Sequence, residues 1–203
     1  MIRSVIILNT SGVPRLTKFY SPIHQSAQAI VAKIYSLISI RSPGSCNFLE
    51  APELDELLGR EDANEKLRVV YRSYATLHFV FVVDSSESEL GILDLIQVRT
   101  LAKVGFFVEA LDRAFENVCE LDLVFHFDEV HHILAEIIQG GLVLETNLDE
   151  IDSAIHQAAS ARKQSFASAN PLTLGVGGMG PRSTGAQTPL GWLTGKLTGV
   201  GAR

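Results

Sequence analysis

Five short apolar segments predict the strands of a single sheet. They comprise residues 3–9, 15–20, 46–50, 67–72 and 77–83. The first two segments are separated by Thr10–Pro14, which contains the glycine and proline of a tight turn. The last segment is continuously apolar, which is typical of a central strand. Because short turns join neighbouring segments, we expect an antiparallel sheet.

Apolar residues at helical spacing predict helices between and after these strands. Ser21 and Pro22 have the sequence of a helix start, and residues 42–44 would end that helix. Ser86 and Glu89 have the spacing of a capping box, which predicts the start of a long helix carrying the apolar stripe of residues 107–118. Two more helices are expected over residues 127–138 and 147–159, with Gly140-Gly141 as the break between them. The order of strands and helices predicts an α+β fold.

Composition indicates one folded domain followed by a tail. The chain has 203 residues, of which 46% are hydrophobic and 20% charged. All acidic residues lie at or before Asp152, which leaves a net charge of −11 up to that residue and +5 beyond it. From residue 161 onward the chain is rich in Gly, Ser, Thr, Ala and Pro, and such a segment buries too little apolar surface to fold. We therefore expect a domain over residues 1–160 and a disordered, basic Gly/Ser-rich tail over 161–203, with a docking segment at 190–197 as the alternative.

Charge and cysteine content restrict the possible function. The net charge of −6 argues against generic binding to nucleic acid, which requires a basic surface. Cys46 and Cys119 belong to no CxxC motif, so neither a disulfide framework nor a cysteine zinc site is expected. This cysteine usage favours a reducing, cytosolic location. No apolar run reaches the roughly 18 residues of a membrane-spanning helix, so we expect membrane contact to be peripheral or through partners.

Motifs of common enzyme classes are absent from the sequence. It contains no P-loop, dinucleotide-binding, nucleophile-elbow or HExxH motif. His126 and His131 could share a metal ion with Asp128, but the exposed start of an amphipathic helix explains these residues equally well. We expect no catalytic residue, no metal and no cofactor. A metal-dependent hydrolase based on the two histidines remains as an alternative.

Four segments resemble the small sigma chains of heterotetrameric clathrin-type adaptor complexes. They are Asn47–Glu50, Tyr71–Phe79, Phe107–Asp112 and Phe115–Phe125, and the last of them is highly specific. The resemblance covers residues 1–157, and residues 83–96 and 141–147 look most like the sigma subunit of adaptor complex three. It implies a longin-like fold, in which helices flank an antiparallel five-stranded sheet.

The same resemblance implies a non-enzymatic function in vesicle-mediated protein transport. Such a chain assembles with the large and medium chains of the complex. It helps to recognise acidic dileucine signals, of the form acidic-x-x-x-Leu-Leu/Ile, in the cytosolic tails of membrane cargo. The implied location is the cytoplasm and the cytoplasmic face of Golgi and endosomal membranes and transport vesicles, on the way to the vacuole or lysosome. Membrane association would be peripheral and through the complex.

The resemblance also implies a cargo-signal site. The two leucines of the signal would lie in an apolar pocket, and Arg15 would face its acidic residue. Burying two leucines contributes a few kcal/mol, whereas a surface Arg–carboxylate contact contributes about 1 kcal/mol or less. In the alternative interpretation Leu77, Val108, Val118 and Leu123 are ordinary core residues and Arg15 is a solvated strand end. The implied pocket residues are Tyr74, Ala75, Leu77, Val108, Asn117, Val118, Leu121 and Leu123.

Two segments depart from the family pattern. Residues 99–106 interrupt a stretch that is continuous in the family, and eight extra helical residues at about 100° each would rotate the following stripe by about 80°. The insert is therefore either a bulge that loops out or an error in joining coding segments. Glu53–Leu58 itself has the sequence of an acidic dileucine signal. We consider that it could occupy the cargo pocket as a competitor, with a solvated amphipathic turn as the alternative.

A longin-like regulator of membrane fusion or tethering is the alternative function. Such a protein is expected to carry a heptad-bearing coiled-coil segment after the domain. The Gly/Ser-rich composition after residue 160 does not have that pattern.

Overall fold

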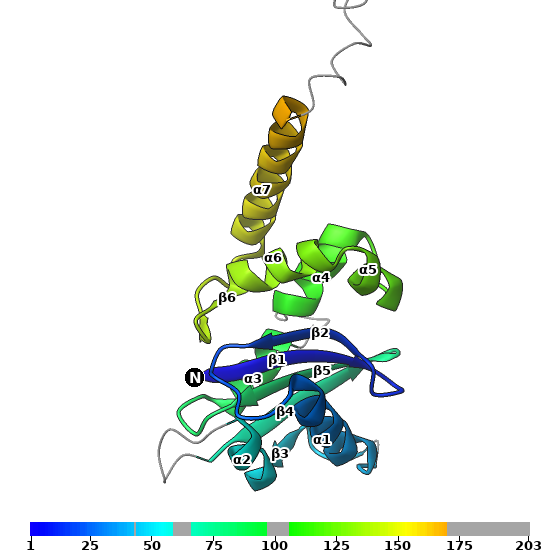
Figure 1. The fold of residues 1–203 in the computed structure, drawn as a ribbon, viewed down its shortest axis with the longest axis vertical. Coiled ribbons are helices and arrows are strands. Elements are labelled where there is room, and N and C mark those ends of the chain that lie inside the picture. Colours follow the sequence, from blue (N-terminus) through cyan, green and yellow to red (C-terminus); the bar gives the residue numbers. More distant parts are fainter. Residues whose placement is uncertain (43, 59–65, 97–105, 170–203) are drawn as a thin grey trace, which may run out of the picture. The chain divides into compact units, whose positions relative to one another are not determined.

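A five-stranded antiparallel sheet forms the centre of the fold (Figure 1). The strand order is β2-β1-β5-β4-β3, which places β1 and β5 in the middle. This arrangement confirms the predicted α+β class and the five expected strands. The strands are β1 (Ile2–Asn9), β2 (Pro14–Phe19), β3 (Phe48–Glu50), β4 (Arg68–Tyr74) and β5 (Leu77–Val83).

Helices lie between and after the strands, as expected. The computed structural model describes residues 1–42, 44–58, 66–96 and 106–169. The chain divides into two units, Met1–Ala161 and Arg162–Arg203, and the sheet belongs to the first. The remaining elements are α1 (Ala27–Ser39), η1 (Pro52–Leu54), α2 (Asp55–Leu58), α3 (Glu89–Ile96), α4 (Phe106–Phe115), α5 (Glu120–Phe125), α6 (Phe127–Ile137), β6 (Ile138–Gln139), β7 (Leu142–Val143) and α7 (Leu148–Ala169). Of these, η1, α2 and α5 were not predicted, and α3 and α4 lie where one long helix was expected.

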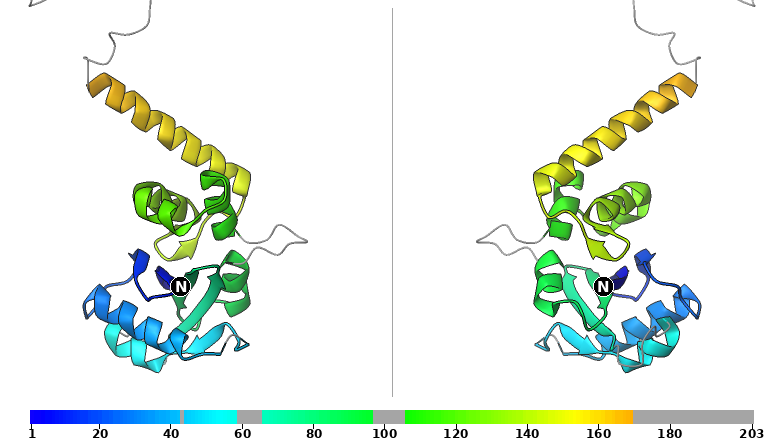
Figure 2. Two further views of the ribbon diagram at one scale, coloured as in Figure 1. Left: turned by 90° about the vertical axis from the view of Figure 1, so that its right-hand side faces the viewer. Right: turned by 90° about the vertical axis from the view of Figure 1, so that its left-hand side faces the viewer.

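Alternate residues of the central strands point into two different apolar clusters. In β1, Val5 and Ile7 face the cluster formed with α3, α4, α6 and the start of α7. Ile6 and Leu8 face the opposite cluster, formed with α1, η1 and α2. The period of two in a strand places successive side chains on opposite faces, so β1 is buried on both sides. The two views in Figure 2 show α1 on one side of the sheet and the α4–α6 layer on the other.

The first helix begins later than the sequence analysis predicts. Ser26, not Ser21, is the N-cap of α1, and its side chain accepts a hydrogen bond from the Ala29 amide at 3.3 Å. Residues 21–26 form bends and irregular chain instead, and Ile23 is exposed. Both Ser21 and Ser26 have a hydroxyl that could cap a helix N-terminus. The apolar residues that α1 buries are Ile30, Val31, Ile34 and Ile38, and this stripe begins only after Ser26.

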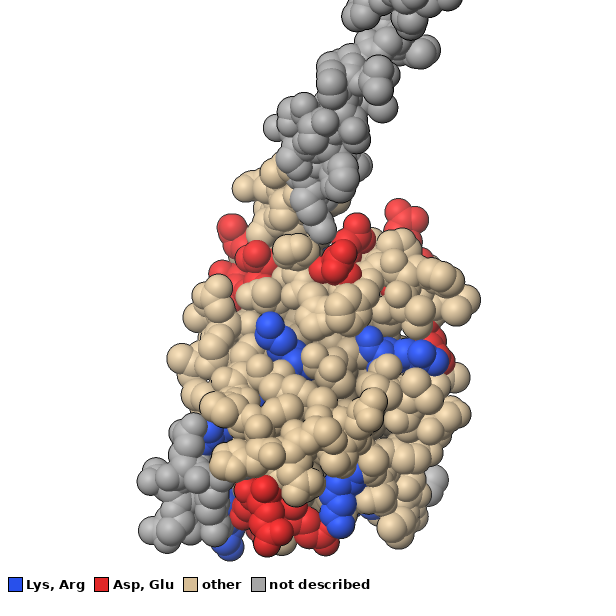
Figure 3. All heavy atoms as spheres, viewed as in Figure 1, with Lys and Arg blue, Asp and Glu red and all other residues tan. Residues whose placement is uncertain are grey.

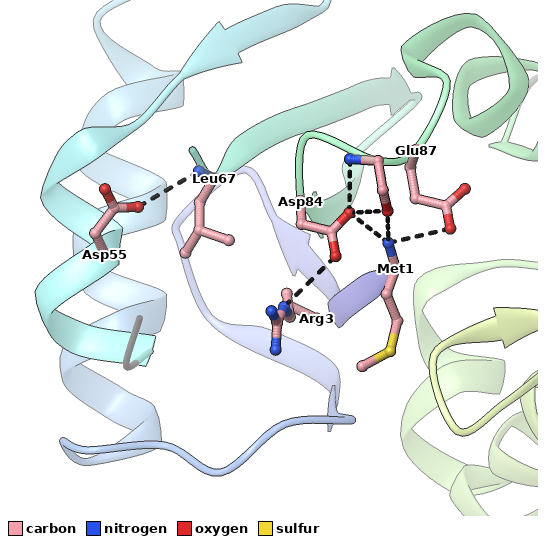
Figure 4. A network of polar contacts seen from close by, with 7 residues as sticks. Met1, Arg3, Asp55, Leu67, Asp84 and Glu87 are labelled. Atoms are coloured by element: carbon pink, nitrogen blue, oxygen red, sulfur yellow. Dashed lines mark hydrogen bonds and ion pairs between the residues drawn. The ribbon is translucent and has the colours of Figure 1, made fainter. Parts of the chain in front are cut away.

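The predicted capping box at Ser86 is also wrong. Ser88 caps α3 by accepting a hydrogen bond from the Gly91 amide at 3.3 Å. Ser86 instead belongs to a polar network around Asp84, shown in Figure 4. Asp84 accepts hydrogen bonds from the N-terminal ammonium and from both the amide and hydroxyl of Ser86, and it lies 3.9 Å from Nε of Arg3. This network joins the start of β1 to the end of β5.

A hairpin occupies the position where the sequence predicts only a break. Gly140 and Gly141 have φ angles of 59° and 81° and form the turn between β6 and β7. Such angles favour glycine. The Gly141 carbonyl accepts a hydrogen bond from the Ile2 amide at 2.9 Å, so the hairpin contacts the start of β1.

The Glu53–Leu58 segment packs into the core of its own domain. Leu54 and Leu58 are fully buried in the α1-side cluster, and Leu57 packs against it. Asp55 accepts a hydrogen bond from the Leu67 amide at 3.4 Å, which joins α2 to the start of β4 (Figure 4). Because Leu58 is already buried, this segment cannot present both leucines to a pocket while α2 is folded. The segment is an amphipathic turn, as in the alternative interpretation, with its leucines toward the core and Glu53 and Glu56 exposed.

The last helix continues beyond the predicted domain end. α7 runs to Ala169, past residue 160, because the polar composition that suggests a tail does not by itself end a helix. Residues 170–203, with the proposed docking segment, lie outside the described residues, as do residues 99–105 of the insert. Phe106, the final residue of the insert, begins α4. Among the helices of the described residues, none combines the length and the hydrophobicity that a membrane-spanning helix needs.

Candidate functional site

Arg15 of β2 and Glu120 of α5 form an ion pair at the centre of the candidate site. One carboxylate oxygen of Glu120 lies 2.8 Å from Nε and 2.7 Å from Nη2 of Arg15. The same oxygen accepts a hydrogen bond from Nδ2 of Asn9 at 3.1 Å. Asn9 pairs with Leu77 at the end of the β4–β5 hairpin, so this contact joins the hairpin to α5.

The ion pair keeps Glu120 ionised. The hydrogen bond from Arg15 is the largest cause that lowers the pKa of Glu120, followed by the hydrogen bond from Asn9. Hydrogen bonds donated to a carboxylate favour its charged form. The charge of Arg15 is therefore balanced within the chain, and Arg15 is not the solvated strand end of the alternative interpretation.

The loop between α4 and α5 is held by two aspartates. Asp112 accepts a hydrogen bond from the Val118 amide at 3.1 Å, and Asp122 accepts one from the Cys119 amide at 2.8 Å. Asn117 has a φ angle of 86°, a left-handed conformation that asparagine tolerates better than most residues. This geometry turns the chain sharply and exposes Asn117 beside Val118.

A chain of aromatic rings connects the β4–β5 hairpin to α4. Tyr74 and Phe79 pack edge to face with ring centroids 5.8 Å apart, and Phe79 and Phe107 do so at 5.9 Å. Val108, the next residue of α4, packs partly buried against the same apolar cluster. Ala75 lies at the tip of the hairpin with a φ angle of 48°. The implied pocket residues of the hairpin and of α4 are thus parts of one packed unit.

The implied site residues differ widely in burial. Leu77 and Leu123 are core residues, 6% and 1% exposed. Tyr74, Val108 and Val118 are partly buried against the same cluster. Ala75, Asn117 and Leu121 are exposed, and Leu121 is 62% exposed. The core interpretation therefore holds for Leu77 and Leu123, while the other residues border the surface.

Glu120 is the residue that the sequence analysis misses. It directly precedes Leu121 in the specific Phe115–Phe125 block. The opposite charges of Glu120 and Arg15 are the sequence feature that could have indicated the ion pair. More than a hundred residues separate the two in sequence, and only the packing of α5 against β2 brings them together.

Exposed apolar side chains surround α5. We call these exposed side chains the α5 apolar surface; they are Leu121, Val124, Phe125 and Phe127. Phe125 is 76% exposed. Most of the face drawn in Figure 3 is tan, the colour of residues other than Lys, Arg, Asp and Glu. Contiguous exposed apolar side chains mark sites that contact another molecule.

The histidine cluster has no metal-binding arrangement in the described residues. The His131 ring packs against Phe127 with centroids 4.2 Å apart, and burial lowers the pKa of His131. His126 packs against Phe115 at 5.3 Å. Within the described ranges, no group of three or more histidine, cysteine or acidic side chains is placed to hold a metal ion. Nothing here supports the metal-dependent hydrolase.

Comparisons with known proteins agree with this fold. The AP-3 complex subunit sigma of Schizosaccharomyces pombe is 55% identical over 168 residues, covering 82% of this chain and 92% of that protein. The human AP-3 complex subunit sigma-2 is 51% identical over 156 residues, covering 76% and 73%. A chain in a homology model of the full-length AP-3 complex in a stretched open conformation superimposes with a TM-score of 0.57 at 38% identity, covering 83% of this chain and 99% of that one. The sequence profile of the clathrin adaptor complex small chain family matches residues 1–162, and the chain belongs to this family.

Proposed function

We propose that the chain is the small, sigma-type subunit of an AP-3 adaptor complex in vesicle transport, and that it helps to recognise acidic dileucine signals on cargo bound for the vacuole or lysosome. The similarity to AP-3 sigma subunits over most of the chain supports the first part. The second part rests on one observation: Arg15 is ion-paired with Glu120, which directly precedes the exposed Leu121, while most of the other implied pocket residues belong to one apolar cluster.

In this proposal, different residues have different tasks. The guanidinium of Arg15 receives the acidic side chain of the signal. Leu121, Val108 and Val118 contact the two leucines, over a floor formed by Leu77 and Leu123. The leucines supply most of the binding energy because burial of an apolar side chain contributes more than an exposed ion pair.

Assembly with the other subunits explains the remaining apolar surface. Val124 and Phe125 of α5 and Phe127, the first residue of α6, are all exposed. A large or medium chain of the complex that covers them would remove this apolar area from water. The complex would then carry the subunit to the cytoplasmic face of Golgi or endosomal membranes, as a peripheral component without catalytic activity.

The binding of a signal peptide to the assembled complex tests the cargo-signal site. Leu121→Ser removes an exposed leucine, so the fold is retained, whereas Leu123→Ser would place a hydroxyl in the core. We expect Leu121→Ser to weaken binding of an acidic dileucine peptide about tenfold. Leu90→Ser in α3 is the matched control, since Leu90 is 67% exposed and lies outside the site. Equal affinities for the unchanged and Leu121→Ser complexes would refute the assignment.

A further inference from the structure

The turn between β1 and β2 connects two residues that contact Glu120, namely Asn9 and Arg15. The Asn9 side-chain oxygen accepts hydrogen bonds from the Ser11 amide at 3.0 Å and from the Val13 amide at 2.8 Å. The Asn9 side-chain nitrogen donates to Glu120 at 3.1 Å. One asparagine therefore fixes both the turn and the carboxylate that holds Arg15.

A β-bulge places Arg15 outside the regular register of β2. Ile7 pairs with Leu16, whereas the next residue of β1 pairs with Pro14, so Arg15 is the extra residue. Leu16 faces the apolar cluster that also contains the buried residue of α5. In a strand without a bulge, the residue before Leu16 would point to the opposite face of the sheet. Because a bulge re-aims side chains, the contact of Arg15 with α5 depends on the backbone at this end of β2.

Tyr35 of α1 contacts the middle of the same turn. Its hydroxyl donates a hydrogen bond to the Thr10 carbonyl at 2.7 Å. Its ring lies against Gly12, whose φ angle is 79°, and an added Cβ there would lie 2.6 Å from the ring. The Tyr35 ring packs, partly buried, against the α1-side cluster. The hydroxyl and the ring together fix the position of the turn relative to α1.

The turn also contacts the tip of the β4–β5 hairpin. The Thr10 amide donates a hydrogen bond to the Thr76 carbonyl at 3.0 Å. After the hydrogen bonds from Arg15 and Asn9, one from the Thr76 side chain is a further cause that lowers the pKa of Glu120. The backbone of Thr10 thus joins α1 to the groups that surround this carboxylate. A displacement of Thr10 would disturb all of them.

We propose that Tyr35 is a positioning residue for the cargo-signal site: through the β1–β2 turn, it holds Arg15 where the guanidinium meets the acidic side chain of the signal. The inference rests on the proposed function of Arg15. A guanidinium that is already held in place loses less freedom when the signal binds, which favours binding. The residues proposed for the two leucines lie on α4, α5 and the loop between them. Tyr35 should therefore affect recognition of the acid and not of the leucines.

Binding of two peptides to the assembled complex tests the proposal. One is an acidic dileucine peptide, and the other has glutamine in place of the acidic residue. Tyr35→Phe keeps the ring against Gly12 and removes only the hydroxyl. We expect it to weaken binding of the acidic peptide about twofold and to leave binding of the glutamine peptide unchanged.

Tyr20→Phe is the matched control for this substitution. It removes a hydroxyl that also donates to a backbone carbonyl, that of Ile138 at 3.4 Å, outside the site. It should leave the affinity for both peptides unchanged. If Tyr35→Phe weakens both peptides equally, its effect is on the fold as a whole and the positioning role is wrong.

Arg15→Gln in the same assay separates this inference from the proposed function. If Arg15→Gln weakens binding of the acidic peptide and Tyr35→Phe does not, the positioning role is overturned while the cargo-signal site stands. If Arg15→Gln leaves the affinity for the acidic peptide unchanged, the cargo-signal site itself is wrong, and the positioning role is wrong with it.

Gly12→Ala tests the same contact from the turn. Its Cβ would collide with the Tyr35 ring, so the turn has to move away from α1. We expect a loss of about threefold for the acidic peptide, as large as that of Arg15→Gln, and none for the glutamine peptide. Gly140→Ala also places alanine at a positive φ angle, 59°, but meets nothing within 4 Å, and should leave binding unchanged. A Gly12→Ala complex that prefers the acidic peptide as strongly as the unchanged complex does would overturn the proposal.

Discussion

Glu120 at the start of α5 holds Arg15 of β2 through a carboxylate oxygen 2.8 Å from Nε and 2.7 Å from Nη2. Arg15 is also the residue that we propose for the acidic group of a cargo signal. The chain thus supplies its own carboxylate to the guanidinium that the signal would use. An incoming acidic side chain has to compete with Glu120 or share Arg15 with it.

Removing the charge of Glu120 should strengthen signal binding. Glu120→Gln retains the size of the side chain but leaves Arg15 without a competing charge, and we expect the affinity for an acidic dileucine peptide to rise about threefold. Fluorescence anisotropy with the assembled complex measures this. Asp128→Asn makes the same change of charge at an exposed position of α6 and serves as the control. An unchanged or weaker affinity of the Glu120→Gln complex would show that Glu120 does not compete with cargo.

The Asp84 network should make stability depend on acid pH. Burial alone would raise the pKa of Asp84, but hydrogen bonds from the N-terminal ammonium and from Ser86 outweigh it and lower the pKa from 3.8 to about 2. The carboxylate therefore stabilises the fold fully above the unfolded pKa. This contribution is lost as the pH falls below 3.8 through the folded pKa of about 2. Thermal melts between pH 5 and pH 2 follow the loss.

Asp84→Asn should remove that pH dependence and destabilise the domain by about 3 kcal/mol, because the buried Arg3 then lies beside a neutral amide and the N-terminal ammonium keeps only Glu87. Urea denaturation measures the free energy of unfolding. Asp94→Asn, at an exposed position of α3, is the control and should behave like the unchanged chain. If Asp84→Asn unfolds at the same urea concentration as the control, the network does not stabilise the fold.

The two glycines of the β6–β7 turn should differ in their tolerance of alanine. Both have positive φ angles, but a Cβ at Gly141 would lie 2.4 Å from the Ile2 carbonyl oxygen, whereas a Cβ at Gly140 meets nothing within 4 Å. We expect Gly140→Ala to cost about 1 kcal/mol from backbone strain and Gly141→Ala about 3 kcal/mol from strain and collision together. Melting temperatures of the two variants give the comparison. Equal losses would mean that the hairpin does not dock on β1.

The strands were predictable because their sequences repeat the pattern that the sheet requires. β5 has the predicted bounds, since an unbroken apolar run of that length suits a strand buried on both faces. The helix starts were less predictable. Four serines have the side-chain chemistry of an N-cap: Ser21, Ser26, Ser86 and Ser88. Tertiary contacts decide which of them cap a helix. The Ser86 hydroxyl is hydrogen-bonded to Asp84, and the apolar stripe of α1 begins only after Ser26. The β6–β7 hairpin was missed because its strands are only two residues long.

The candidate site was only partly accessible from the sequence. The family resemblance indicated which residues lie around the apolar cluster. It did not indicate how deeply each side chain is buried, because burial depends on how the strands and helices pack. Leu121 and Leu123 are two residues apart in a short helix, yet one is mostly exposed and the other is in the core. The Arg15–Glu120 pair arises from a contact between distant segments, which no local pattern encodes.

A double-mutant cycle between Arg15 and the acidic residue of the signal tests the central claim most directly. The dissociation constants of an acidic dileucine peptide and its acid-to-glutamine counterpart are measured with the unchanged complex and with the Arg15→Gln complex. If Arg15 meets the acid, each single change weakens binding about threefold and the two together weaken it no further. If the two losses multiply to about ninefold, the residues act independently and Arg15 does not recognise the signal.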